Sequence, residues 1–261
     1  MAKNSHIQIT QRLLDNFSHT IIDNYKGHPT PLDYVFFLDL NDFRIGVERV
    51  RLFGAECGFY SDESEDLLSK DVEGPFGNTI SKICNKKTIL NDYIFKQDDL
   101  DAFSNFVYYS FCRSKTVFDK TKSTRLNKGT EVENDEIINA INKKENIFSN
   151  HKMVVFDNKT QVEFVIPFNC VTPILFGGRT LYVLFISPKI AIGLYLKKYD
   201  SFTIDIEYKE IKDYHFVDSI NFASYNTETR NRKYIIAQSK ETLVRILQLM
   251  HKPVLEKESE A

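Results

Sequence analysis

The sequence predicts an α+β fold: an N-terminal helix and β-hairpin, a helical middle, and a mainly antiparallel C-terminal sheet packed by a terminal helix. Three observations predict it. Runs of aromatic and β-branched residues near both ends of the chain are typical of strands. Between these runs, apolar residues recur every three or four positions, as they do along one face of a helix. The last periodic segment, residues 241–251, has the same helical spacing.

The N-terminal elements are expected in the order helix, loop and hairpin. Residues 7–18 place their apolar side chains on one side of a helix. Residues 26–31 (KGHPTP) contain one glycine and two prolines, so we expect a loop there. Residues 34–40 and 43–50 are predicted strands, and Asn41-Asp42 between them predicts the turn of a hairpin.

The helical middle is expected in three segments. Apolar residues form a helical stripe over residues 67–83, and Gly74-Pro75 should divide it into two helices or kink it. Residues 98–113 begin with two aspartates, which suit the positive end of a helix dipole. A further helix is predicted over residues 135–148.

The C-terminal half is expected to be mostly strands. The predicted strands are residues 153–157, 162–167, 181–186, 191–196, 203–211 and 234–237. Residues 219–229 are an expected helix, and residues 241–251 are the helix that should cover the sheet.

One α+β domain is predicted over residues 1–252. Residues 113–134 combine several lysines with few large apolar side chains, so we expect an exposed connector between the helical and sheet-rich halves. Residues 253–261 are charged, and we expect a disordered tail.

The charge balance argues against a general nucleic-acid binder. The 261 residues carry a formal net charge of -2, whereas such proteins usually have a clear positive excess. The longest apolar stretch, near residues 181–196, is broken by Ser187-Pro188-Lys189, so no membrane span is expected.

Cysteine usage and the N-terminus predict a cytoplasmic protein. The four cysteines lie far apart without a CxxC pair, so neither a zinc knuckle nor a thioredoxin-like motif is expected. Buried, reduced thiols in the cytoplasm are the simplest interpretation. The first residues are too polar for a secretory signal.

Four stretches share their motifs with one protein family. They are GFYSDESEDLLSKDVEG (58–74), LDAFSNFVYYSFCRS (100–114), LYVLFISPKIAIGLY (181–195) and SINFASYNTETRNRKYIIAQS (219–239). Together they resemble the uncharacterised bacterial DUF4238 family. The resemblance implies a fold without an activity, and a role in defence against phage or mobile elements is an association that it suggests.

The resemblance also implies binding residues at matching positions. These are Asp66, Glu73, Arg113, Asn169 and Asn221. Glu65, Asp66 and Glu73 return near one helix face and suit metal ligands. Acids near a helix start, however, also stabilise the helix dipole with no further function. The chain departs from the family at Phe168, which stands where relatives have an aspartate.

A second hypothesis rests on residues 205–209. Asp205, Glu207 and Lys209 alternate on a predicted strand and should point to one face. Two carboxylates that hold Mg²⁺ beside a lysine form the skeleton of restriction-type nucleases. The alternative is a row of charges that faces solvent, which simple strand alternation also predicts.

We therefore expect a non-catalytic binding or accessory protein that acts on a protein partner and needs no cofactor. The alternative is a metal-dependent nuclease or phosphodiesterase that uses Mg²⁺. The sequence contains no GxSxG, Walker or GxGxxG motif. It names neither the partner nor the activity.

Overall fold

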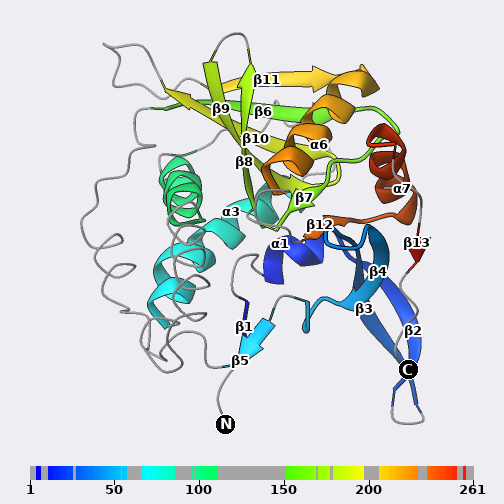
Figure 1. The fold of residues 1–261 in the computed structure, drawn as a ribbon. Helices are drawn as coiled ribbons and strands as arrows, with labels where there is room; N and C mark the ends of the chain where they lie inside the picture. The colour runs from blue at the N-terminus through cyan, green and yellow to red at the C-terminus, as the bar shows by residue number, and fades with distance from the viewer. Residues whose placement is uncertain are drawn as a thin grey trace, which may run out of the picture.

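The computed structural model describes residues 4–6, 11–25, 28–53, 55–57, 66–85, 96, 98–110, 151–168, 170–176, 179–196, 206–228, 234–251 and 255–256. Within these ranges the chain forms two mostly antiparallel sheets with helices packed on them, so the predicted α+β class is confirmed (Figure 1). No described helix is long and apolar enough to cross a membrane.

One sheet joins strands from both ends of the chain in the order β13-β4-β3-β12-β7, with β2 also paired to β3. Its strands are β2 (His19–Tyr25), β3 (His28–Asp39), β4 (Arg44–Arg49), β7 (Ile166–Pro167), β12 (Tyr234–Ala237) and β13 (Leu255–Glu256). The predicted hairpin is β3 and β4. A separate antiparallel pair joins β1 (Asn4–His6) to β5 (Ala55–Cys57).

Two N-terminal expectations need correction. Residues 28–31, expected as loop, begin β3. Pro29 and Pro31 occupy positions of β3 where a backbone N–H would point away from β2, so the missing N–H groups cost the β2–β3 pair no hydrogen bond. The expected N-terminal helix, α1 (Gln11–Asn16), ends earlier than predicted, at Asn16 instead of residue 18, and residues 7–10 of that prediction lie outside the described residues. Within the expected tail, Leu255–Glu256 form β13, parallel to β4.

The other sheet comes from the second half of the chain, in the order β11-β6-β10-β9-β8. Its strands are β6 (His151–Asn158), β8 (Val171–Phe176), β9 (Arg179–Ser187), β10 (Ile190–Leu196) and β11 (Ile206–Ile211). Only β11 and β6 pair in parallel, and the other pairs are antiparallel.

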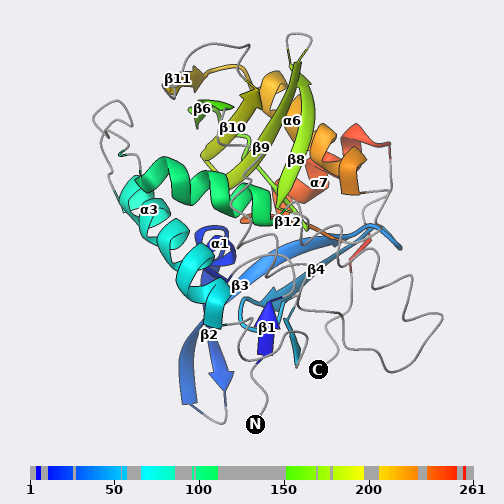
Figure 2. The same cartoon turned by 90° about the vertical axis from the view of Figure 1, so that its left-hand side faces the viewer.

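The described helical middle is a pair of packed segments. A π-helix, η1 (Leu68–Glu73), passes without interruption into α3 (Gly74–Asn85), so the helix changes type at Gly74-Pro75, where two helices or a kink were expected. Residues 98–110 form the next helix, and Phe106 stacks on Phe76 with ring centroids 3.6 Å apart. Both helices lie on the side of the molecule away from α7 (Figure 2). The connector and helix expected within residues 113–148 lie outside the described residues.

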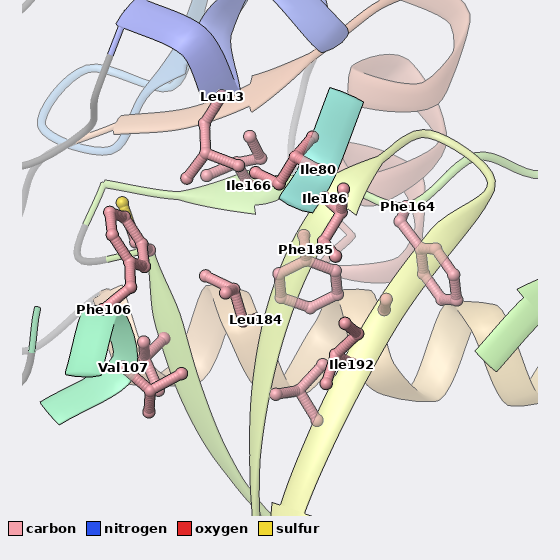
Figure 3. Packing of buried hydrophobic residues seen from close by; sticks show 14 of the residues in the cluster. Leu13, Ile80, Phe106, Val107, Phe164, Ile166, Leu184, Phe185, Ile186 and Ile192 are labelled. Atoms are coloured by element: carbon pink, nitrogen blue, oxygen red, sulfur yellow. The ribbon is translucent and has the colours of Figure 1, made fainter. Parts of the chain in front are cut away.

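A large core joins the helical middle to the five-stranded sheet. One cluster of buried residues includes side chains from α1, α3, the 98–110 helix and both sheets. In Figure 3, Leu13, Ile80 and Ile166 point toward one another, and Phe106, Val107 and Leu184 belong to the same cluster. The Asn16 side chain also donates to the Ile186 carbonyl at 3.0 Å, which fixes α1 to β9.

Two C-terminal helices cover further sheet surface. The helix α6 (Tyr214–Glu228) crosses the five-stranded sheet, where Phe216 packs near Phe156 (Figure 1). The helix α7 (Lys240–Leu249) packs on β3 and β12 of the six-stranded sheet. This second core contains Leu38, Leu40, Ile45, Val165, Ile235, Ala237, Leu243, Ile246 and Leu247.

Candidate functional site

Two of the three predicted catalytic residues, Glu207 and Lys209, lie on the edge strand β11. Glu207 and Lys209 are exposed, and Tyr208 between them packs against the core, so the strand alternates as expected. Burial raises the pKa of Tyr208. Asp205 lies outside the described residues. Within the part of the chain that the structure describes, no three His, Cys, Asp or Glu side chains gather to hold a metal ion.

The predicted binding residues do not form one described site. Asp66 is exposed at the start of the helical segment that includes η1, and Glu73 is half-buried at the end of η1. Arg113 and Asn169 lie outside the described residues. Asn221 is buried within α6, in a different part of the molecule.

Asn221 uses its amide group to hold the segment that precedes β7. Its Oδ1 accepts from the Val165 N–H at 3.2 Å, and its Nδ2 donates to the Glu163 carbonyl at 2.8 Å. The Glu163 carboxylate in turn accepts from Ser239 and Thr242 at the start of α7. These bonds satisfy groups inside the protein and fix α6 and α7 to the 163–165 segment.

The position at which the family's aspartate is expected is part of the aromatic core. Phe168 is 4% exposed, and its ring packs edge-on against Tyr234 at 5.6 Å and Phe53 at 6.4 Å. An apolar ring buried among aromatic side chains contributes packing and no acid–base chemistry.

A further exposed surface is a two-stranded arm formed by the β2–β3 hairpin. The arm consists of β2 and the first half of β3, residues 19–25 and 28–34, and it projects away from both cores in Figures 1 and 2. Thr20, Ile21 and Ile22 are all exposed, with 41% of Ile21 and 74% of Ile22 accessible to solvent. Successive strand residues point to opposite faces, so both faces are open here.

The register shows which backbone groups of β2 face outward. The Asp33 carbonyl accepts from Val50, on the β4 side of β3, so the backbone groups of Asp33 point away from β2. Thr20 lies opposite Asp33 and Ile22 lies opposite Pro31, two residues along. Antiparallel pairs alternate between bonded and non-bonded positions. The N–H and C=O groups of Thr20, Ile22 and Asn24 therefore point to the outer side of β2, which we call the open edge.

Several other described edges carry features that oppose strand pairing. Natural sheets block their edges with charges, prolines or very short strands. The edge strand β11 carries Glu207, Lys209 and Glu210, while β8 contains Pro173. The strands β7 and β13 have two residues each. On the arm itself, Pro29 and Pro31 occupy outward positions of β3.

In contrast, β2 has the sequence HTIIDNY, with seven residues and neither Lys nor Pro. The β-branched run Thr20-Ile21-Ile22 is a strand signal in the sequence. It is the signal from which this surface could have been found, although its exposure depends on the fold.

Fold and site together define an α+β protein in which no described strand pairs with the outer side of β2. The chain matches no protein-family model, and no curated protein or solved structure is significantly similar to it. The resemblance to DUF4238 therefore stays a prediction.

Proposed function

We propose that this chain is a non-catalytic binding protein that captures an extended segment of a protein partner along the open edge of β2. The observation that carries the proposal is the combination on one strand of outward N–H and C=O groups with exposed isoleucines. Such an edge adds a further strand, whose backbone bonds supply affinity and whose side chains supply specificity.

The physical chemistry of the arm favours a protein segment as ligand. A peptide strand matches the alternating donors and acceptors of Thr20, Ile22 and Asn24 at the spacing of a sheet. Its apolar side chains would cover Ile21 and Ile22, which water now contacts on both faces of the arm. Burial of apolar surface contributes about 25 cal/mol per Å².

Site-specific photocrosslinking in cells tests the proposal. A benzophenone amino acid at position 22 should give protein adducts, and the same group at Leu175 of β8 is the control. Leu175 is 80% exposed but lies on an edge strand that contains a proline. No adducts from position 22 above those from position 175 would contradict the proposal.

A matched pair of variants at Thr20 tests whether backbone hydrogen bonds of β2 hold the partner segment that gives the adducts. Thr20→Pro removes an outward N–H, whereas Thr20→Val keeps it. Both variants lack the Thr20 hydroxyl, which donates to the Asp33 carboxylate at 2.7 Å. The loss of this bond therefore cannot explain a difference between them. Adducts from position 22 should fall only with proline.

The nuclease hypothesis has its own test. Mg²⁺-dependent cleavage of DNA or RNA by the purified protein, lost in Glu207→Ala, would overturn the non-catalytic proposal. Lys212→Ala is the control, because Lys212 is exposed just beyond β11 and pairs with Glu210.

The proposed setting is a bacterial cytoplasm, in a system that defends against phage or mobile elements. Its support is the resemblance to DUF4238 alone. Plaque counts in a bacterium that carries the gene should differ between the wild type and Thr20→Pro, and equal counts would remove the defence proposal.

A further inference from the structure

We infer that the segment bound at the open edge is β2 of a second copy of this chain, in an antiparallel pair centred on Ile22. This inference rests on the proposed function, since it names the occupant of the same edge. The pairing would join the two six-stranded sheets across a two-fold axis.

Symmetry limits the registers that are available. A two-fold axis perpendicular to a sheet places equivalent residues on the same face, so each pair must join positions of the same parity. The outward groups of β2 belong to Thr20, Ile22 and Asn24, which share one parity. A centre at Ile22 therefore bonds Ile22 to its copy, and bonds Thr20 to Asn24 on each side.

The strand sequence is self-complementary in this register. With Ile22 opposite Ile22, every residue from His19 to Tyr25 faces a residue of the second copy. Ile21 then lies opposite Asp23, and His19 lies opposite Tyr25, so no acid faces an acid. The most exposed apolar side chain of β2, that of Ile22, is placed against its own copy.

The alternative centres are less favourable. With a centre at Ile21, only residues 19–23 of the two copies overlap. Residues 24–25 of each copy then extend past the end of the other β2. A centre at Asp23 places two aspartates directly opposite each other, and like charges at that position are destabilising. The register centred on Ile22 is the one that uses the whole strand.

A strand pair alone buries less surface than a standard stable interface, so the dimer should be concentration-dependent. Sedimentation equilibrium of the full-length protein should show a reversible monomer–dimer equilibrium. Ile22→Pro removes the central N–H from both copies and should weaken the dimer about tenfold or more. Ile22→Val keeps both the N–H and the β-branched side chain and should dimerise as the wild type does.

Ile22→Pro should still fold, because Ile22 does not donate to β3. Ile22→Lys is the second variant: it keeps the N–H group but places two ammonium groups opposite each other. It should also weaken the dimer, and circular dichroism would show that both variants retain the wild-type fold.

Disulfide trapping tests the register itself. The Cα atoms of a hydrogen-bonded antiparallel pair are about 5.5 Å apart, which suits a disulfide. In a glutathione redox buffer, Ile22→Cys should form a covalent dimer. Thr20→Cys, which would face Asn24, and the exposed Leu175→Cys on β8 should form far less.

A monomer at every concentration would overturn the second-copy inference, and so would a dimer that Ile22→Pro leaves intact. In either case, adducts from position 22 with other proteins would still support the proposed function. If the protein does not dimerise through β2 and position 22 also gives no adducts above the control, the second-copy inference and the proposed function are both wrong.

Discussion

The Arg245 guanidinium holds the Asp218 carboxylate at two points, with Nε 2.7 Å from Oδ1 and Nη2 2.6 Å from Oδ2. Asp218 lies on α6 and Arg245 on α7, so the pair joins the two C-terminal helices. Arg245 also lies 5.1 Å from the centre of the Tyr214 ring. The bond to Asp218 raises the pKa of Arg245.

We expect Arg245→Met to destabilise the protein by about 1–2 kcal/mol. The substitution leaves the buried Asp218 without its guanidinium partner, and water screens the pair only partly, because the Arg245 side chain is 37% exposed. Urea denaturation measures the change. Glu210→Gln, which breaks the exposed pair with Lys212, is the control and should change stability by less than about 0.5 kcal/mol. Equal losses of stability in the two variants would show that the Arg245–Asp218 pair stabilises the fold no more than an exposed ion pair does.

We expect Asn221→Leu to destabilise the protein by about 2–4 kcal/mol, because the Glu163 carbonyl and Val165 N–H lose their amide partner. Thermal unfolding measures this loss. Asn78→Leu, at an exposed position of α3, makes the same chemical change without those bonds. A fully stable Asn221→Leu would instead favour the role in binding that the resemblance implies.

We expect Gly46→Ala to destabilise the protein by about 1–3 kcal/mol through overpacking. A Cβ atom at Gly46 would lie 2.8 Å from Cε1 of Phe37, directly across the β3–β4 pair. The Phe37 ring is held by Phe53 and Tyr234, with centroids 5.2 and 5.3 Å away. Phe37→Leu in the same chain should offset part of the loss, as measured by a double-mutant cycle in urea. Purely additive effects would contradict this account.

His19 should make folding less favourable in mild acid. Its ring stacks on Phe36 at 4.5 Å, and neither ring nitrogen has a hydrogen-bond partner among the described residues. Desolvation lowers the pKa of His19 below 6.5, although Asp33 partly opposes the shift. Below pH 6.5 the unfolded chain therefore takes up a proton more readily than the folded chain, so stability falls as pH falls.

The effect cannot exceed about 1.4 kcal/mol per pH unit. His19→Phe should remove this part of the pH dependence between pH 7.5 and 5.5, measured as the free energy of unfolding in urea. A slope unchanged by His19→Phe would refute the assignment.

The sequence predicted the elements whose local pattern agrees with their packing. Residues 234–237 form β12 as expected, and Gly74-Pro75 marks the boundary between η1 and α3. Prolines hid two other elements. Pro29 and Pro31 concealed the first half of β3, and Pro173 concealed β8, because each lies on a strand edge where its missing N–H costs little.

The open edge could not be predicted because it depends on long-range pairing. The β-branched run of β2 indicates a strand, but not which of its sides faces solvent. That property follows from the position of β4 on the far side of β3, shown by the bond from Val50 to Asp33. Asn221 shows the same limit. The family resemblance indicated this residue, but its hydrogen bonds to residues 163–165 join parts of the chain that are more than 50 positions apart and arise only in the fold.

The strand order of the six-stranded sheet has a consequence for synthesis on the ribosome. The strand β3 needs β12, whose residues are translated roughly 200 positions later, on the order of 10–40 s at about 5–20 residues per second. During that interval the apolar residues of β3 have no permanent cover from β12 or α7. We therefore expect the nascent chain to expose these apolar residues to ribosome-bound chaperones during that interval.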